Sequence, residues 1–273
     1  MGRSAALDGI AGELVGLLGS GRQIRPFSQR EGGLGLADAY RVTDRVRRLR
    51  MARGETPVGR KIGFTNRTIW DEYGVHAPIW GPVYDSTVRD LAAVAGGFAL
   101  AGLAEPRLEP EIVLGLARAP EPGMDEAALL GCLEWVAHGF EIVQSVFPGW
   151  VFAPADTVAA FGLHGALLVG PRRPVPAAGQ GAWLASLAGF EIELWRDGAL
   201  MDRGRAANVL DGPLSALRHL VGLLAEDPVN PPLAAGELVT TGTLTRALPI
   251  APGERWQTRL SGIALEAIEV RFA

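Results

Sequence analysis

Residues 107–115 read Arg-Leu-Glu-Pro-Glu-Ile-Val-Leu-Gly, and residues 140–146 read Phe-Glu-Ile-Val-Gln-Ser-Val. Both segments are rich in the apolar and β-branched residues that are typical of strands inside a sheet. Residues two apart in a strand point to the same face, so Glu109 and Glu111 are expected side by side. Glu141 stands in the second predicted strand. The sequence therefore places three carboxylates within an apolar sheet.

Carboxylates inside an apolar sheet destabilise the fold unless another group balances their charge. They repel each other, and their removal from water is costly. A hard divalent cation relieves both problems, and several carboxylate ligands suit Mg²⁺ or Mn²⁺. The alternative is a solvated face, or ion pairs with Arg107 and Arg118. The Glu-x-Glu pattern is common, so on its own it leaves both interpretations open.

Composition narrows the class of protein. A chain of 273 residues can form one large domain, or one domain with a small appendage. Its net charge of −4 gives no electrostatic reason to expect nucleic acid as a partner. There is no run of eighteen apolar residues and no signal-peptide pattern at the N-terminus, so no membrane partner is expected. The single cysteine, Cys132, lies in an apolar stretch, which predicts a core residue in a cytoplasmic protein.

The order of predicted elements indicates the fold class. Apolar periodicity predicts helices over residues 7–18, 36–53, 125–137 and 213–225. Strand-like runs occur near residues 139–146, 164–170, 188–196, 237–241, 255–260 and 263–272. Helices followed by strands favour an α+β fold with a mixed, largely antiparallel β core. We expect residues 1–60 to form an N-terminal helical subdomain and residues 61–273 to form the main domain.

The second predicted helix carries many arginines on its polar faces. A basic helix can bind an anion, but a solvated outer face is the favoured interpretation. These arginines are Arg41, Arg45, Arg47, Arg48 and Arg50.

A lysine stands in an unusual setting. Residues 58–65 read Val-Gly-Arg-Lys-Ile-Gly-Phe-Thr, which places Lys61 in a short apolar strand flanked by glycines. If Lys61 is buried, an anion or a metal-bound carboxylate is its natural partner. The alternative is a side chain that extends to the surface. The segment alone leaves the two open.

Together, these and other motifs resemble a known family over nearly the whole chain. The family is the hydratase/decarboxylase branch of the fumarylacetoacetate hydrolase superfamily, typified by 2-keto-4-pentenoate hydratase and 4-oxalocrotonate decarboxylase. The resemblance implies that family's fold, a divalent metal held by Glu109, Glu111 and Glu141, and Lys61 facing the substrate. It rests on Gln-Ile-Arg-Pro at 23–26, Gly-Arg-Lys-Ile-Gly-Phe-Thr at 59–65, Glu-Pro-Glu at 109–111, Phe-Glu-Ile-Val at 140–143, Asn-Val-Leu-Asp-Gly-Pro-Leu-Ser-Ala-Leu at 208–217, Thr-Gly-Thr at 241–243 and Val-Arg-Phe at 270–272.

Departures from the family pattern are concentrated around the expected pocket. Ile79 stands where hydratases of this kind typically carry an acidic residue. In the stretch 159–165, the expected acidic, amide and hydroxyl groups are replaced by Ala160, Phe161, Leu163 and His164. Hydration of an alkene needs a positioned water and a general base, so these changes argue against the hydratase reaction.

The remaining groups predict a metal-dependent lyase. A 2-keto acid or a related 1,3-dicarbonyl would react through an enolate that the metal stabilises, most simply by decarboxylation. Lys61 would stabilise the developing charge or deliver a proton. His164 is the candidate general acid or base near neutral pH, and a packed core histidine is the alternative.

Five further residues are expected to contact a small keto acid substrate. Gln144 and Thr243 would orient it. Ile79, Phe161 and Leu163 would make the pocket more apolar, which favours a bulkier or less charged substrate than the small dienoates.

Two other functions remain open. The first is a C–C bond hydrolase that activates water with a His/Glu pair, for which Glu72 and His76 lie four residues apart. The second is a non-catalytic partner of a related enzyme, because relatives in this branch associate with one another. A homo-oligomer is expected in either case.

Overall fold

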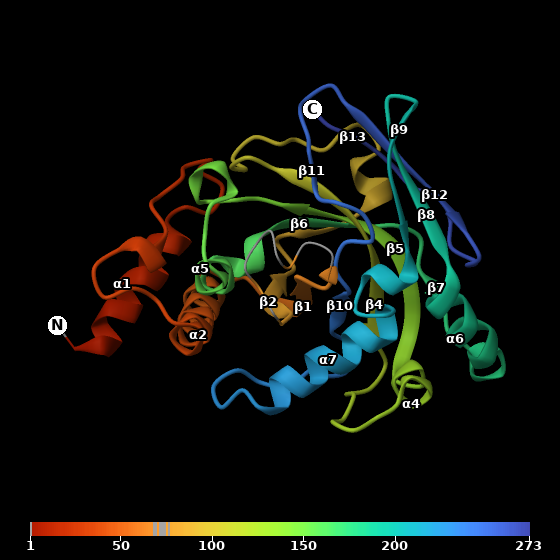
Figure 1. Cartoon of the computed structure of the whole chain (residues 1–273), viewed down its shortest axis with the longest axis horizontal. Helices are drawn as coiled ribbons and strands as arrows, with labels where there is room; N and C mark the ends of the chain where they lie inside the picture. Colours follow the sequence, from red (N-terminus) through yellow and green to blue (C-terminus); the bar gives the residue numbers. More distant parts are fainter. Residues whose placement is uncertain (1, 68–69, 71–74, 76) are drawn as a thin grey trace.

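The computed structural model describes residues 2–67, 70, 75 and 77–273. Figure 1 shows a curled sheet, with α1, α2 and α5 at one end and a second, smaller sheet at the other. The helices are α1 (Arg3–Val15), α2 (Leu36–Ala52), α4 (Glu126–Leu130), α5 (Pro154–Ala159), α6 (Gln180–Gly189) and α7 (Pro213–Ala225). Single 3₁₀ turns cover Phe27–Gln29, Leu91–Val94, Pro148–Trp150, Phe161–Leu163, Ala177–Gly179 and Ala206–Asn208.

The larger sheet has the order β2-β1-β10-β4-β5-β6-β3, with β11 paired to β4 and β7 paired to β5. The pairs β1–β10 and β3–β6 are parallel and the other pairs are antiparallel. Its strands are β1 (Pro57–Gly63), β2 (Ile79–Tyr84), β3 (Val88–Asp90), β4 (Arg107–Leu116), β5 (Leu133–Val143), β6 (His164–Val169), β7 (Arg173–Pro174), β10 (Leu238–Thr240) and β11 (Leu248–Pro249). The predicted mixed, largely antiparallel β core is confirmed.

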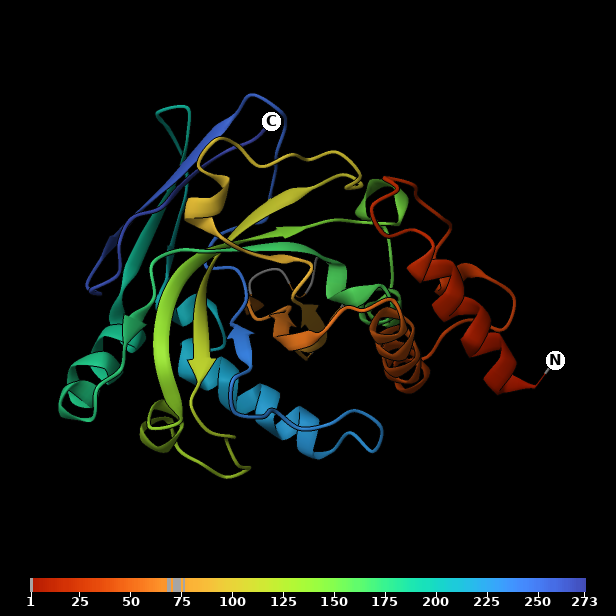
Figure 2. The same cartoon turned by 180° about the vertical axis from the view of Figure 1, so that it is seen from behind.

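The second sheet is antiparallel, in the order β13-β12-β8-β9. Its strands are β8 (Glu191–Arg196), β9 (Ala199–Arg205), β12 (Arg255–Ser261) and β13 (Glu269–Arg271). Figure 2 shows α7 alongside the larger sheet. The apolar face of α7, with Leu217 and Leu220, shares a buried cluster with Ile112 and Leu114 of β4. Burial of this face stabilises the helix more than its own propensity does.

The N-terminal helices have the predicted apolar faces. Leu7 and Leu14 of α1 and Val42 of α2 are buried in one cluster with Val158 of α5. That cluster also contains Ile79 at the start of β2. The helical segment therefore shares its core with residues beyond position 60, and the boundary at that position stays a prediction.

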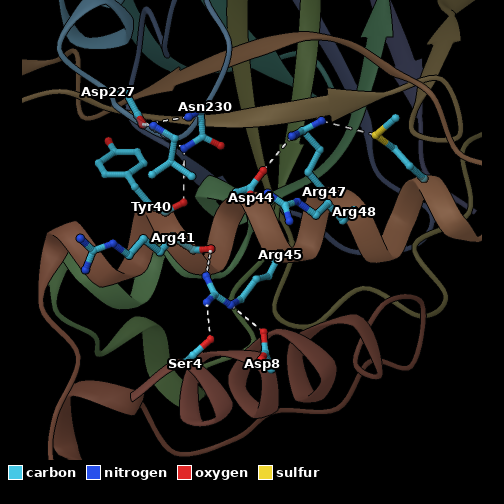
Figure 3. A network of polar contacts seen from close by, with 12 residues as sticks. Ser4, Asp8, Tyr40, Arg41, Asp44, Arg45, Arg47, Arg48, Asp227 and Asn230 are labelled. Carbon is cyan, nitrogen blue, oxygen red and sulfur yellow. Dashed lines mark hydrogen bonds and ion pairs between the residues drawn. The ribbon is translucent and has the colours of Figure 1, made fainter. Parts of the chain in front are cut away.

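Four of the five arginines of α2 pair with acidic residues of α1 or α2, and Arg50 pairs with Glu55 just after α2. Arg45 donates to Asp8 of α1 at 2.6 Å and to Ser4 at 3.1 Å. Asp44 accepts from both Arg47 and Arg48 at 2.7 Å (Figure 3). The Arg45–Asp8 pair joins α1 to α2, whereas the pairs of Asp44 lie within α2. Both kinds of pair engage guanidinium groups that an anion would otherwise bind.

The helix predicted over residues 125–137 is wrong beyond residue 130. It stops at Leu130, and β5 begins at Leu133. Val136 pairs with Leu114 of β4, and the ring of Trp135 covers Gly115, where a Cβ atom would lie 2.0 Å from it. A short apolar run fits both the helical and the strand periodicity, and the pairing with β4 makes this segment a strand.

Two helices after residue 140 were not predicted. In α5, Pro154 occupies the first turn and Asp156 accepts from the Ala153 amide at 2.9 Å, which caps the helix. In α6, Leu187 is the buried residue. The strand predicted over 263–272 is reduced to β13. None of the helices in the described residues combines the length and apolar character needed to span a membrane.

Candidate metal and substrate site

Three glutamates meet where β4 and β5 pair. Glu109 and Glu141 are direct antiparallel partners, and Glu111 lies two residues along β4 on the same face. One oxygen from each carboxylate lies within 4.8 Å of the corresponding oxygens of the other two. Glu111 and Glu141 are fully buried, and Glu109 is partly exposed. The pairing of the strands thus gathers the three predicted metal ligands.

The electrostatics of the group disfavour its full ionisation in the absence of a cation. Burial raises the pKa of Glu109 to about 7, and the charge of Glu141 adds to this effect against that of Lys61. Burial and the charges of Glu141 and Glu109 hold the pKa of Glu111 well above its usual range. Like charges in a buried place raise each other's pKa values in this way.

A divalent cation fits this donor set. Glu111 Oε2 accepts from the Gly242 amide at 2.7 Å, but the buried Oε1 has no hydrogen-bond partner among the described residues. A buried carboxylate oxygen without a donor is costly. Hard oxygens from Glu109, Glu111 and Glu141 are ligands that Mg²⁺ and Mn²⁺ prefer, and a cation would satisfy the orphaned oxygen.

Glu141 is held by three side chains. Its Oε1 lies 3.4 Å from Lys61 Nζ and 2.8 Å from His164 Nδ1, and its Oε2 accepts from Thr240 Oγ1 at 3.4 Å. Burial alone would raise the pKa of Glu141, but the charge of Lys61 and the hydrogen bond from His164 lower it to about 2. Glu141 is therefore the carboxylate that stays ionised.

Lys61 reaches the site from β1, which lies between β2 and β10. Its partner in register is Thr240, and only 3% of the residue is exposed, so the surface alternative is excluded. Burial lowers the pKa of Lys61, but the charges of Glu141, Glu109 and Glu111 outweigh this effect and raise it. Lys61 is protonated at neutral pH.

The turn Phe161–Leu163 lies against Lys61 and has a strained backbone. Phe161, Gly162 and Leu163 all have left-handed backbones, with φ of 63°, 61° and 64°. Residues other than glycine rarely adopt this conformation, and it often occurs at functional sites. A Cβ atom on Gly162 would lie 2.9 Å from Lys61 Cδ, so the glycine lets the turn approach the lysine closely.

His164 is engaged on both ring nitrogens. Nδ1 lies 2.8 Å from Glu141 Oε1, and Nε2 lies 2.9 Å from Thr87 Oγ1. The side chain is fully buried. The predicted acid or base role of His164 stays a prediction, while the geometry directs its ring at a metal-site carboxylate.

A cavity of about 60 Å³ opens beside the glutamates. Its lining combines a charged part with an apolar wall. The polar residues of the lining are Lys61, Thr65, Asn66, Glu109 and Thr243, and the others are Ile62, Gly63, Phe64, Ile79, Val143, Trp150, Phe152, Gly162, Leu163 and Ala247. The volume suits a small ligand.

The structure brings three of the five predicted substrate-binding residues to this cavity, namely Ile79, Leu163 and Thr243. Gln144 is turned elsewhere, and its Oε1 accepts from the Ala104 amide at 3.1 Å. Phe161 is buried, with the guanidinium carbon of Arg50 5.9 Å from its ring centre. The binding roles of Gln144 and Phe161 stay predictions.

Sequence reasoning missed several lining residues. Thr65 and Asn66 directly follow the Lys61 strand, and this position was the signal that could have identified them. Trp150 ends the 3₁₀ turn Pro148–Trp150 and Phe152 follows it, and no local pattern connects either residue to the site. Glu72 and His76, the pair considered for a hydrolase, lie outside the described residues.

A larger hollow of about 500 Å³ lies over the second sheet. Arg203, Arg205 and Arg259 contribute to its lining together with Glu191 and Glu193. It contains none of the three metal-site glutamates, so the chemistry described above belongs to the smaller cavity.

Comparisons with known proteins agree with this site. No family model matches the chain. The 2-hydroxyhexa-2,4-dienoate hydratase of Comamonas testosteroni is 32% identical over 254 residues, which cover 92% of each protein. The 4-oxalocrotonate decarboxylase of Pseudomonas putida G7, solved with magnesium and adipate, has a TM-score of 0.86 at 26% identity and covers 100% of this chain and 99% of that one.

A more distant structure shares the fold alone. The fumarylpyruvate hydrolase of Pseudomonas aeruginosa, in complex with Mn²⁺ and pyruvate, has a TM-score of 0.55 at 17% identity, covering 78% of this chain and 88% of that one. Metal ions thus accompany the fold in both solved structures. The fold, the acidic triad and the identity to the hydratase lead to one conclusion: the chain belongs to the hydratase/decarboxylase branch of the fumarylacetoacetate hydrolase superfamily, a branch of metal-dependent enzymes.

Proposed function

We propose that the protein is a divalent-metal-dependent lyase that decarboxylates a 2-keto acid or a related 1,3-dicarbonyl. Glu109, Glu111 and Glu141 would hold the metal, which fits their carboxylate chemistry and the orphaned oxygen of Glu111. A bound Mg²⁺ or Mn²⁺ supplies Lewis-acid stabilisation for the negative charge that develops on a substrate oxygen. The observation that best supports the proposal is the cavity in which Lys61 and Glu109 meet an apolar wall.

The reaction requires a carboxylate placed β to a carbonyl, or vinylogous to one. When its C–C bond breaks, CO₂ leaves and the bonding electrons move into the carbonyl to form an enolate. A proton then adds to carbon. Lys61 lines the cavity, so its ammonium group can stabilise the enolate and deliver that proton.

The apolar wall favours loss of CO₂ over addition of water. Ile79, Phe152 and Leu163 line the cavity, and Lys61 is the cation among its described lining residues. A carboxylate against such side chains loses its hydration, and conversion to neutral CO₂ relieves that cost. The same wall offers little support for an attacking water.

His164 would act on the site through Glu141. A histidine that bonds a ligating carboxylate fixes that ligand's orientation. Its contacts with Glu141 and Thr87 suit this positioning role, whereas the predicted acid or base role would require it to reach the substrate. The homo-oligomeric state and the cytoplasmic location stay predictions.

Hydration is the second candidate, because the relative from Comamonas testosteroni is named a hydratase.

A turnover assay of the metal-loaded protein distinguishes the candidates. The substrate panel contains 2-keto acids with a β or vinylogous carboxylate, 2-hydroxydienoates and acylpyruvates. CO₂ release and ultraviolet absorbance are followed together, with and without chelator. Chelator-sensitive CO₂ release supports the proposal. Consumption of the dienoate without CO₂ favours hydration, and cleavage of acylpyruvates to two acids favours a hydrolase. Absence of turnover with metal bound favours a non-catalytic partner.

A further inference from the structure

Thr65 carries a buried hydroxyl that has no protein partner. Only 1% of the residue is exposed, and its Oγ1 makes no hydrogen bond with the described residues. Thr65 lines the cavity that also contains Lys61, Glu109 and Thr243. Most buried hydroxyls are paired, so an orphaned one on a residue that lines a cavity needs an explanation.

The backbone around Thr65 is fixed without the hydroxyl. The Thr65 carbonyl accepts from the Leu210 amide at 3.1 Å. The Phe64 carbonyl accepts from Trp70 Nε1 at 2.8 Å, and Arg67 pairs with Asp211 at 2.8 Å. Contacts on both sides thus hold the segment in place, and the hydroxyl is not needed to position it.

The hydroxyl also lies against Gly242, a residue that contacts one of the three carboxylates. Gly242 has a φ of +96°, and a Cβ atom on it would lie 1.8 Å from Thr65 Oγ1. The amide of the same glycine donates to Glu111 Oε2, while Glu111 Oε1 is the other orphaned oxygen of the site. Two unpartnered buried oxygens therefore belong to residues that both contact Gly242.

We propose that Thr65 Oγ1 donates a hydrogen bond to an oxygen of the bound keto acid and so determines how its carboxylate-carbonyl end is oriented. This inference rests on the proposed function, because it uses the same cavity. The hydroxyl is orphaned in the free protein because the substrate oxygen is its partner. Lys61 supplies charge to the ligand, and Thr65 supplies a directed donor.

The role predicts effects of opposite sign on binding and on stability. Replacement of an unpaired buried hydroxyl by a methyl group of similar shape is neutral or stabilising for the free protein. The same replacement removes a donor from the complex. A hydroxyl with a structural role would instead lower stability on replacement and leave ligand binding unchanged.

Pyruvate is a suitable probe, because it has the keto acid end and no β carboxylate to lose. Its affinity for the Mg²⁺-loaded protein is measured by calorimetry, and urea unfolding is measured on the metal-free protein. Thr65→Val should weaken pyruvate binding about tenfold, with Mg²⁺ affinity unchanged and the unfolding midpoint equal or higher. Thr65→Ser, which keeps the donor, should restore most of the affinity.

Thr157→Val is the matched control. Thr157 is equally buried, but its Oγ1 donates to the Pro154 carbonyl at 2.7 Å, away from the cavity. This variant should lose stability and keep pyruvate affinity. Equal affinity of Thr65→Val and wild type, or a lower unfolding midpoint for Thr65→Val, would overturn the Thr65 proposal alone. A wild-type protein that binds Mg²⁺ but no pyruvate would instead count against the proposed function.

Discussion

His138 on β5 bonds the backbone of Glu111 on β4, with Nδ1 3.1 Å from the Glu111 carbonyl oxygen. Its Nε2 lies 3.0 Å from Thr258 Oγ1 on β12. A neutral ring that donates from Nδ1 and accepts at Nε2 satisfies both contacts. One buried histidine therefore ties β4, the strand of Glu109 and Glu111, to the second sheet.

The burial of His138 makes the stability of the protein depend on pH, and its hydrogen bond to the Glu111 carbonyl opposes this effect only in part. Burial lowers the pKa of His138 from 6.5 to about 4. Between these values the unfolded chain binds the proton and the folded protein does not, so the His138 contribution is complete above pH 6.5. This contribution to the free energy of unfolding is lost as pH falls toward 4, by about 3 kcal/mol.

Urea unfolding of metal-free wild type and His138→Gln at pH 4.5 and 7.5 measures the His138 contribution. The buried glutamates titrate in both proteins, so the difference between them isolates His138. Parallel pH profiles for the two proteins would contradict the assignment.

Glu111→Gln should abolish high-affinity Mg²⁺ or Mn²⁺ binding without unfolding the protein. The change replaces a buried carboxyl group, whose pKa is raised by burial and by Glu141, with a neutral amide of similar shape, so the metal-free fold should be as stable as wild type or more so. Calorimetric titration with Mn²⁺ and thermal unfolding test both parts. Glu134→Gln, on an exposed position of β5, is the control and should bind metal normally. If Glu111→Gln binds metal as tightly as wild type, the site is misassigned.

Lys61→Met should lower kcat by about 10²–10⁴-fold, because the proton donor of the cavity is removed while the apolar stem is kept. Steady-state kinetics on the substrate found with the panel measure the loss. Metal affinity, measured in parallel, separates an effect on chemistry from one on the acidic triad. Activity within a few-fold of wild type would exclude Lys61 as the donor.

His164→Ala should weaken metal binding or activity by about 10–100-fold, because Glu141 loses the partner that orients it. Thr87→Val removes only the outer contact of the ring and should have a smaller effect in the same direction. If excess metal restores turnover in His164→Ala, the histidine acts through Glu141. A loss that metal does not restore would favour the acid or base role, and undiminished turnover would assign His164 to packing.

The sequence by itself determined the local part of the site. Strand alternation placed Glu109 and Glu111 on one face, because side chains two apart must point the same way. The glycine-flanked segment placed Lys61 on a strand, and the order of the motifs identified the family. The stretch 125–137 shows the limit of this reasoning, since its apolar residues suited both a helix and a strand until Val136 paired with Leu114.

Tertiary structure alone decided the contacts between distant residues. The register of β4 on β5 set Glu141 opposite Glu109, and the strand order β1-β10-β4 brought Lys61 to the same carboxylates. The left-handed turn at Gly162 and the orphaned hydroxyl of Thr65 depend on neighbours far along the chain. Burial, hydrogen-bond satisfaction and the resulting pKa values are properties of that packing, so no local pattern in the sequence contains them.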